Sequence, residues 1–199
     1  MIASMVTSDA TSDASLLGGD AASEGCEARA IPSFRAIYAE FFSPIWRTLR
    51  RLGVEQAQVD DAVQDVFIVV HRRLPEFDGR SLRGWLYAIA VRVASDHRRG
   101  AAQRRTVPLP PTLVDPKPDP ARASELEESV RLLHQLLGEL DEPKRTVFVL
   151  GELEELSVPE IAAALGENQN TVASRLRAAR ERFDEVFRRH RARSRGKQP

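Results

Sequence analysis

The sequence predicts an all-α protein made of two small helical domains. Apolar residues recur at the i, i+3, i+4 and i+7 spacing of helices on both sides of a proline-rich stretch, and no segment shows the alternation typical of strands. A chain of 199 residues can bury one medium core or two small ones. The predicted organisation is a disordered tail, a helical domain, a linker, a second helical domain and a basic tail, at residues 1–30, 31–105, 106–122, 123–190 and 191–199.

Residues 1–30 are predicted to be disordered because they are acidic and poor in large apolar groups. Cys26, the only cysteine, excludes an internal disulfide and a cysteine-based metal cluster, as expected for a reducing cytosol. Neither a secretory signal nor a membrane span is recognisable. We therefore expect a cytoplasmic protein without a membrane partner.

Three helices are predicted in the first half. The first begins near Phe34, restarts or kinks at Pro44 and ends at a left-handed Gly53. The second spans about Val59–Leu74, and the third follows a cap at Ser81. The third helix has one continuous apolar stripe: Leu82, Trp85, Leu86, Ile89, Ala90, Val93 and Ala94.

Six prolines between residues 106 and 120 predict an extended linker. Helical spacing resumes beyond it in Leu126, Val130, Leu133, Leu136, Leu137 and Leu140. Asp141 before Pro143 predicts the start of a further helix, which carries Val147, Phe148 and Leu150.

A helix-turn-helix is predicted near the C-terminus. Ser157 and Glu160 have the spacing of a capping box, Gly166 ends the short helix, and Asn168 can cap the next one. The apolar face of that next helix is Val172, Leu176, Ala179 and Phe183. Its other face carries short polar groups and then arginines, as suits a helix that reads the major groove.

Charge supports a nucleic-acid interface in this half. The whole chain has a formal charge of +0, but residues 171–199 hold ten Lys and Arg against three Asp and Glu. The alternative interpretation is an ordinary helical hairpin with a solvated basic face.

Four segments in this order resemble sigma-70 family factors, and among them the small extracytoplasmic-function (ECF) class that keeps only regions two and four. They are Asp60–Phe67, Gly84–Ala90, Asp96–Arg99 and Thr171–Leu176. The resemblance implies a sigma factor that binds core RNA polymerase, recognises the −10 and −35 promoter elements and initiates transcription of a specific regulon. It also implies an anti-sigma factor as a protein partner, and a linker that threads through the polymerase. Without the resemblance, the linker could equally be only a spacer.

The resemblance assigns three sets of site residues. Those expected to bind polymerase are Asp60, Asp61, Gln64, Asp65 and Phe67. Those expected at the −10 element, where a base is flipped out of the duplex, are Phe77, Asp78, Gly79, Arg80, Ser81, Arg92, Asp96, Arg98 and Arg99. Those expected at the −35 element are Gln169, Asn170, Thr171, Ser174, Arg175, Arg177 and Arg180.

Some of these assignments have a simpler alternative, and two positions differ from the pattern of the family. Without the resemblance, the carboxylates would be an ordinary solvated face, and Trp85 fits the core better than a stacking platform. Arg92 stands where many relatives have asparagine, and Ala173 where many have a basic residue. The resemblance therefore implies no particular promoter sequence.

Two other functions are compatible with the sequence. A conventional helix-turn-helix regulator would bind duplex DNA without polymerase, and a helical adaptor would bind only protein. An enzyme is not expected, because the four histidines have no metal-ligand spacing and no catalytic triad is recognisable. No cofactor, metal or small-molecule substrate is predicted.

Overall fold

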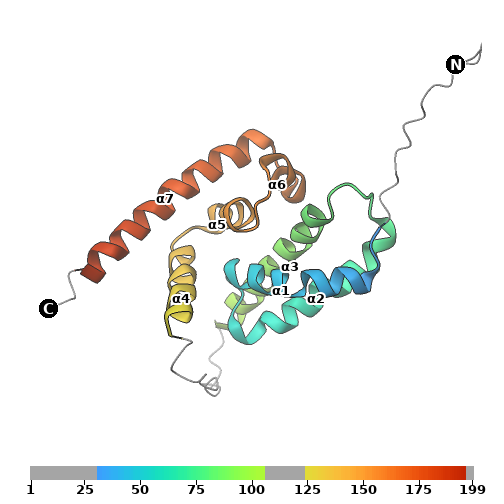
Figure 1. The fold of residues 1–199 in the computed structure, drawn as a ribbon, viewed down its shortest axis with the longest axis horizontal. Coiled ribbons are helices and arrows are strands. Elements are labelled where there is room, and N and C mark those ends of the chain that lie inside the picture. The colour runs from blue at the N-terminus through green and yellow to red at the C-terminus, as the bar shows by residue number, and fades with distance from the viewer. Residues whose placement is uncertain (1–30, 106–123, 196–199) are drawn as a thin grey trace, which may run out of the picture.

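The computed structural model describes residues 31–105 and 124–195, and within them every regular element is a helix (Figure 1). The predictions for the tail at 1–30, Cys26 and the linker at 106–122 lie outside these residues. The long helices are α1 Phe34–Arg51, α2 Val59–Arg73, α3 Leu82–Arg105, α4 Ser124–Gly138, α5 Glu142–Phe148, α6 Val158–Leu165 and α7 Gln169–Arg195. The short ones are η1 Gln56–Gln58, η2 Leu74–Glu76 and η3 Val149–Leu153.

Helix α1 begins and ends at residues that the sequence identifies. The Ser33 hydroxyl accepts a hydrogen bond from the Ala36 N–H at 3.3 Å, and Gly53 follows the helix with φ +93°. Of the two outcomes predicted at Pro44, the restart is wrong, because α1 continues through that residue, and the kink stays a prediction. The Thr48 hydroxyl lies 2.9 Å from the Pro44 carbonyl in the preceding turn and 2.7 Å from the Glu154 carboxylate.

Helices α1, α2 and α3 pack into a three-helix unit (Figure 1). Helix α3 starts after Ser81, whose hydroxyl accepts from the Gly84 N–H at 3.2 Å. The predicted stripe on α3 is buried or partly buried. Tyr87 lies off that stripe, yet it is only 2% exposed. The second half of the chain covers it, as described below.

The second half consists of α4, α5 and the helix-turn-helix pair α6 and α7. Asp141 caps α5 by accepting from the Lys144 N–H at 2.9 Å. Leu150 belongs not to α5 but to η3, a π-helical turn that follows it directly. Helix α7 runs to Arg195, so residues 191–195 continue the helix instead of forming the separate tail that the sequence predicted.

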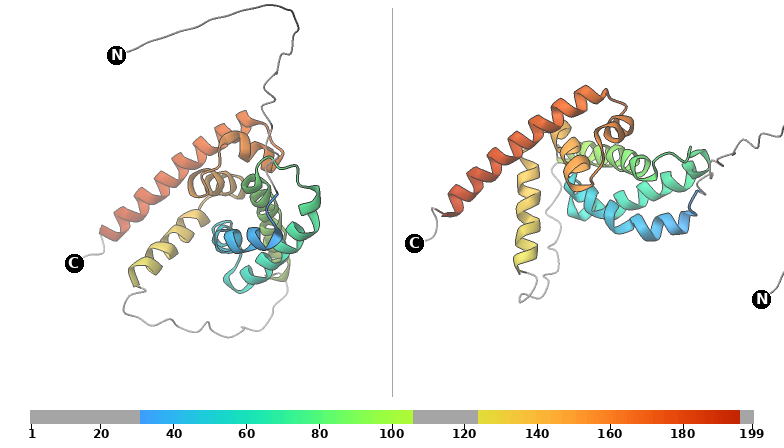
Figure 2. Two further views of the ribbon diagram at one scale, coloured as in Figure 1. Left: turned by 45° about the vertical axis from the view of Figure 1, so that its right-hand side comes forward. Right: turned by 45° about the horizontal axis from the view of Figure 1, so that its top comes forward.

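The two halves pack against each other. Helix α3 contacts α6, and α1 contacts α4. Figure 2 shows from two further directions that α5 and α6 lie beside the first unit, while α7 extends away from it. The buried apolar residues of both halves form one continuous cluster.

Glu155 lies in the left-handed region, with φ 54°, in the loop between η3 and α6. We predict that Glu155→Gly raises the free energy of unfolding by about 1 kcal/mol, because glycine adopts this conformation without the strain of a Cβ. Urea denaturation measures the change. The matched control is Glu181→Gly on the exposed side of α7, which we expect to lower stability by about 0.5–1 kcal/mol. A loss for Glu155→Gly as large as that of the control would contradict the prediction.

Candidate functional site

The acidic face of α2 is open to solvent. The Asp60, Asp61 and Gln64 side chains are exposed. Asp60 accepts a hydrogen bond at 2.9 Å from the indole N–H of Trp46 on α1, which fixes its carboxylate. Among the described residues, no hydrogen bond or ion pair reaches the carboxylate of Asp61, so it is available to a partner.

The other two predicted polymerase-binding residues differ from each other. Asp65 is exposed and lies 2.9 Å from the imidazole of His97 on α3. Phe67 is only 4% exposed and therefore belongs to the core. Its ring also lines a hollow of about 620 Å³ between α1 and α2, together with Tyr38 and Phe42. Phe67 can thus shape this surface but presents little of its own area.

The loop before α3 holds the first of the predicted −10 residues. Phe77 is buried, with its ring centroid 5.1 Å from that of Trp85. Gly79 has φ +77°, and the Asp78 carboxylate accepts from the Arg80 backbone N–H at 3.1 Å, so the loop is folded tightly. The guanidinium of Arg80 remains largely exposed.

A cavity of about 540 Å³ lies beside this loop, within the range of roughly 300–1,000 Å³ typical of small-ligand pockets. Five of the predicted −10 residues line it, namely Phe77, Asp78, Arg80, Ser81 and Arg92. Trp85 lines it as well, so this side chain both packs and faces the cavity. The opposite wall comes from α6, through Pro159, Glu160, Ala163 and Ala164.

Gly79 and the three predicted residues near the end of α3 do not line the cavity. Asp96 and Arg99 pair with each other on the exposed side of the helix. Arg98 points inward, where it donates to the Leu52 carbonyl and pairs with Glu142 of α5. Only 16% of its side chain is exposed, so it is not available to DNA in this arrangement.

The helix-turn-helix is built as predicted. The Ser157 hydroxyl accepts from the Glu160 N–H and the Ser157 N–H donates to the Glu160 carboxylate, which completes the capping box. The hydrogen bond from this backbone N–H is the main reason that the pKa of Glu160 lies below its usual value. Gly166 ends α6 with φ 67°, and the Asn168 side chain accepts from the Asn170 N–H at 2.8 Å.

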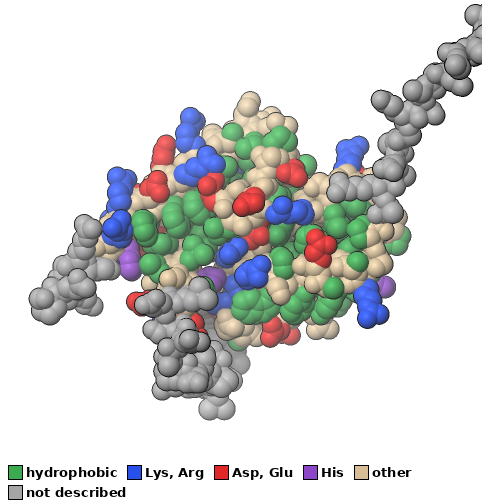
Figure 3. Space-filling view, in the orientation of Figure 1, with side chains coloured by type: hydrophobic (Ala, Val, Ile, Leu, Met, Phe, Trp, Pro, Cys, Tyr) green, Lys and Arg blue, Asp and Glu red, His purple; other side chains and the backbone are tan. Residues whose placement is uncertain are grey.

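The outer face of α7 carries polar and basic side chains, and Figure 3 shows Lys and Arg side chains along this helix, interspersed with Asp and Glu. Its exposed predicted residues are Gln169, Asn170, Thr171, Ser174, Arg177 and Arg180. Arg175 is partly buried and pairs with Glu167 at 2.6 Å, whereas Arg180 pairs with Glu152. Arg177 projects from the middle of this face, and in the described part of the chain no hydrogen bond or ion pair holds it.

Sequence reasoning missed the contribution of the second half to the cavity and to the packing of the first half. Glu154 is 6% exposed and contacts residues of α1 and α3. Ser81 and Glu160 are 3.2 Å apart although 79 positions separate them. No periodicity or motif carries information on such distant pairs.

These features define a helical DNA-binding protein in which a helix-turn-helix is joined to a second unit with an exposed acidic face. Residues 37–105 match the family described as Sigma-70 region 2, and residues 131–183 match Sigma-70, region 4. The chain belongs to the sigma-70 family of RNA polymerase sigma factors.

Similar proteins of known name are sigma factors as well. The RNA polymerase sigma-H factor of Pseudomonas aeruginosa is 32% identical, over 78% of this chain and 86% of its own. The ECF RNA polymerase sigma factor SigL of Mycobacterium tuberculosis is 30% identical, over 78% and 89%. CnrH, a sigma factor known from Cupriavidus metallidurans, has a solved structure in complex with the cytosolic domain of CnrY. The sequence of CnrH in that structure is 28% identical to this chain. That structure has a TM-score of 0.60 and covers 77% of this chain and 86% of CnrH.

Within residues 31–105 and 124–195, no helix combines the length and apolarity needed to cross a membrane.

Proposed function

We propose that this chain acts in the cytosol, binds core RNA polymerase through the outer face of α2, and directs it to promoters with −10 and −35 elements. The observation that carries this proposal is the pairing of two surfaces on one chain. An exposed acidic face lies on α2, and a polar and basic recognition face lies on α7. The first suits a protein surface with basic groups, and the second suits the major groove of a duplex.

The roles of the DNA-facing residues follow from their positions. Residues in the first turns of α7, such as Gln169, Asn170 and Ser174, can reach base edges at the −35 element. Arg177 and Arg180 lie further along the helix and suit phosphates. The loop with Phe77 and Arg80 beside the cavity suits an unstacked base of the −10 strand, because aromatic and cationic groups offset the loss of stacking.

A protein regulator is part of the proposal. CnrH was solved with the cytosolic domain of CnrY, which is a protein partner. We extend this to the present chain as a partner that competes with core polymerase, an anti-sigma factor in function. Copurification of such a partner with the tagged chain, and its displacement of core polymerase, would test this part.

The test of the main proposal is reconstitution with bacterial core RNA polymerase on genomic DNA fragments. We expect transcripts that start at discrete sites and need the chain, with core enzyme alone as the control. Those starts would also give the promoter sequences. Tight binding to duplex DNA without polymerase, combined with no discrete starts, would favour a conventional helix-turn-helix regulator.

A further inference from the structure

Two of the three carboxylates on the acidic face of α2 are bound by the neighbouring helices. The indole N–H of Trp46 on α1 donates to the Asp60 carboxylate at 2.9 Å. The imidazole Nε2 of His97 on α3 lies 2.9 Å from the Asp65 carboxylate. The carboxylate of Asp61 has no such partner among the described residues. The face therefore consists of one free acid between two that are held.

Trp46 acts on Asp60 as a hydrogen-bond donor, because the indole nitrogen cannot accept. Its ring is partly buried and packs against the core, so the position of the donor is fixed by the fold. Of the two Asp60 oxygens, Oδ1 takes this hydrogen bond, and within the described part of the chain no hydrogen bond reaches Oδ2. The carboxylate is thus oriented while one of its oxygens stays available to a partner.

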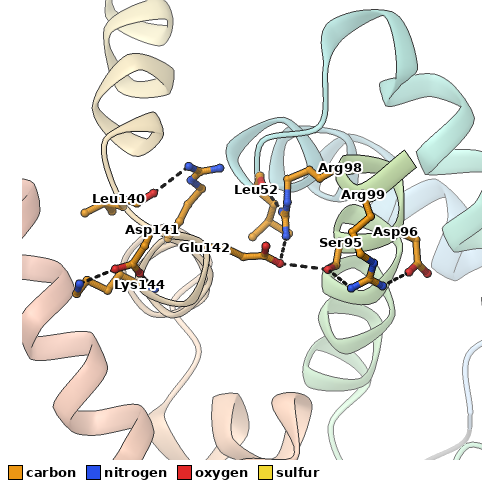
Figure 4. Close-up of polar contacts among 10 residues, drawn as sticks. Leu52, Ser95, Asp96, Arg98, Arg99, Leu140, Asp141, Glu142 and Lys144 are labelled. Carbon is orange, nitrogen blue, oxygen red and sulfur yellow. Dashed lines mark hydrogen bonds and ion pairs between the residues drawn. The ribbon is translucent and has the colours of Figure 1, made fainter. Parts of the chain in front are cut away.

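His97 lies in the segment Asp96–Arg99 near the end of α3, but its contacts differ from those of its neighbours. The polar contacts of the neighbours run within α3 and across to Leu52 and Glu142 (Figure 4). His97 contacts Asp65 on α2, and only 18% of its side chain is exposed, against 55% for Asp65. Because an ionised carboxylate can only accept, Nε2 carries the proton in this contact. An exposed acid is therefore held by a largely covered donor.

These two donors prepare the acidic face for a partner. A carboxylate that rotates freely loses that freedom when a partner binds it, and the loss reduces affinity. A carboxylate that is already held in one orientation has lost much of this freedom in the unbound chain. Because the donors come from α1 and α3, the affinity of the face depends on the whole three-helix unit and not on α2 alone.

We propose that Trp46 and His97 are positioning residues for the binding of core RNA polymerase. Each acts through the carboxylate that it holds, without contact of its own with the polymerase. The partner is a surface whose lysine or arginine side chains meet the oriented carboxylates. This role rests on the proposed function of the α2 face, whereas the two contacts themselves do not.

Trp46→Phe removes the indole N–H and keeps an aromatic ring on α1. We expect it to weaken binding to core RNA polymerase by about 3–10-fold, as the loss of one hydrogen bond and of the order it provides would do. Competition against a labelled, unchanged chain measures the affinity. In an Asp60→Ala background the substitution should have no further effect, because the carboxylate through which Trp46 acts is gone. In an Asp61→Ala background, which is the matched control, the full loss should remain.

Two replacements of similar size separate the donor from the shape of His97. His97→Gln keeps an N–H donor at the end of the side chain, whereas His97→Met fills similar space without one. We expect His97→Met to lose about 3–10-fold in affinity for core enzyme, and His97→Gln to lose less than about twofold. The loss for His97→Met should vanish in an Asp65→Ala background and persist in an Asp61→Ala background.

Losses that persist undiminished in the Asp60→Ala and Asp65→Ala backgrounds would overturn the proposal, because the two residues would then act on the fold or touch the polymerase directly. Unchanged affinities of Trp46→Phe and His97→Met would overturn it as well.

The hydrogen bond of Trp46 can also be tested without polymerase. The chain has two tryptophans, so its NMR spectrum contains two indole N–H signals, and Trp46→Phe identifies one of them by removing it. We expect Asp60→Ala to move this signal upfield, since the proton loses its bond to a carboxylate, and Asp61→Ala to leave it in place. A signal that ignores Asp60→Ala would refute the positioning of Asp60. No binding of the unchanged chain to core enzyme would overturn the proposed function together with this role, whereas binding that ignores Trp46 and His97 would overturn this role alone.

Discussion

Asp61→Arg should reduce the affinity of the chain for core RNA polymerase by about 10–100-fold, which corresponds to about 1.4–2.8 kcal/mol. Asp61 is exposed in the centre of the acidic face of α2. Because no hydrogen bond or ion pair among the described residues depends on its carboxylate, the change should leave the fold intact, at a cost of at most about 1 kcal/mol from the lost interaction with the N-terminus of α2. A basic group there would repel the basic surface that we propose as its partner. Competition for core enzyme against a labelled, unchanged chain measures the effect, and transcription should fall in parallel.

Glu139→Arg is the matched control for this charge reversal. Glu139 is exposed in the turn between α4 and α5, away from α2. It should leave the affinity for core enzyme within about twofold, because an exposed charge remote from an interface contributes little to binding. Equal losses for the two variants would show a general effect of charge, and no loss for Asp61→Arg would place the docking face elsewhere.

Leu176→Ala should lower the free energy of unfolding by about 2–4 kcal/mol. Leu176 is 4% exposed on the inner face of α7. It packs so closely on Gly151 that a Cβ at this glycine would come within 3.2 Å of the Leu176 side chain. The lost side chain leaves a cavity beneath the recognition helix, in a protein whose total stability is expected to be about 5–15 kcal/mol. Urea denaturation measures the loss.

The adjacent change Arg177→Ala separates stability from recognition. Arg177 lies on the outer face of α7 and is exposed, so its removal should alter stability by no more than about 0.5 kcal/mol. It should instead weaken binding to duplex DNA with a −35 element by about tenfold, through lost contact with phosphate or base. If Arg177→Ala destabilised the chain as much as Leu176→Ala, the assignment of inner and outer faces would be wrong.

Local signals in the sequence located most of the helix ends. Ser81, Asp141 and Ser157 cap the helices that follow them, and Gly53 and Gly166 follow helices with positive φ. Each signal works within four residues of chain, because a cap satisfies backbone groups in the adjacent turn. The restart predicted at Pro44 was wrong for the opposite reason. The packed face of α1 on both sides of it outweighs the local preference of proline to end a helix.

The candidate site was predictable only in part. The exposed positions of Asp61 and Arg177 follow from helical period, since the apolar face of each helix must turn inward. The burial of Phe77, the inward turn of Arg98 and the wall that α6 adds to the cavity do not follow from any period. These features depend on which distant element packs nearby.

The sequence by itself determined the all-helical fold, the helix-turn-helix and the faces that remain open to partners, because caps and apolar period act over one or two turns. Only the tertiary structure decided that the halves close on each other. Glu154 looks like one of several acids in its segment, yet its hydrogen-bond partners are Thr48 and Tyr87, 106 and 67 positions away. A buried carboxylate needs donors from every side. Which donors these are is settled by packing in space and not by order along the chain.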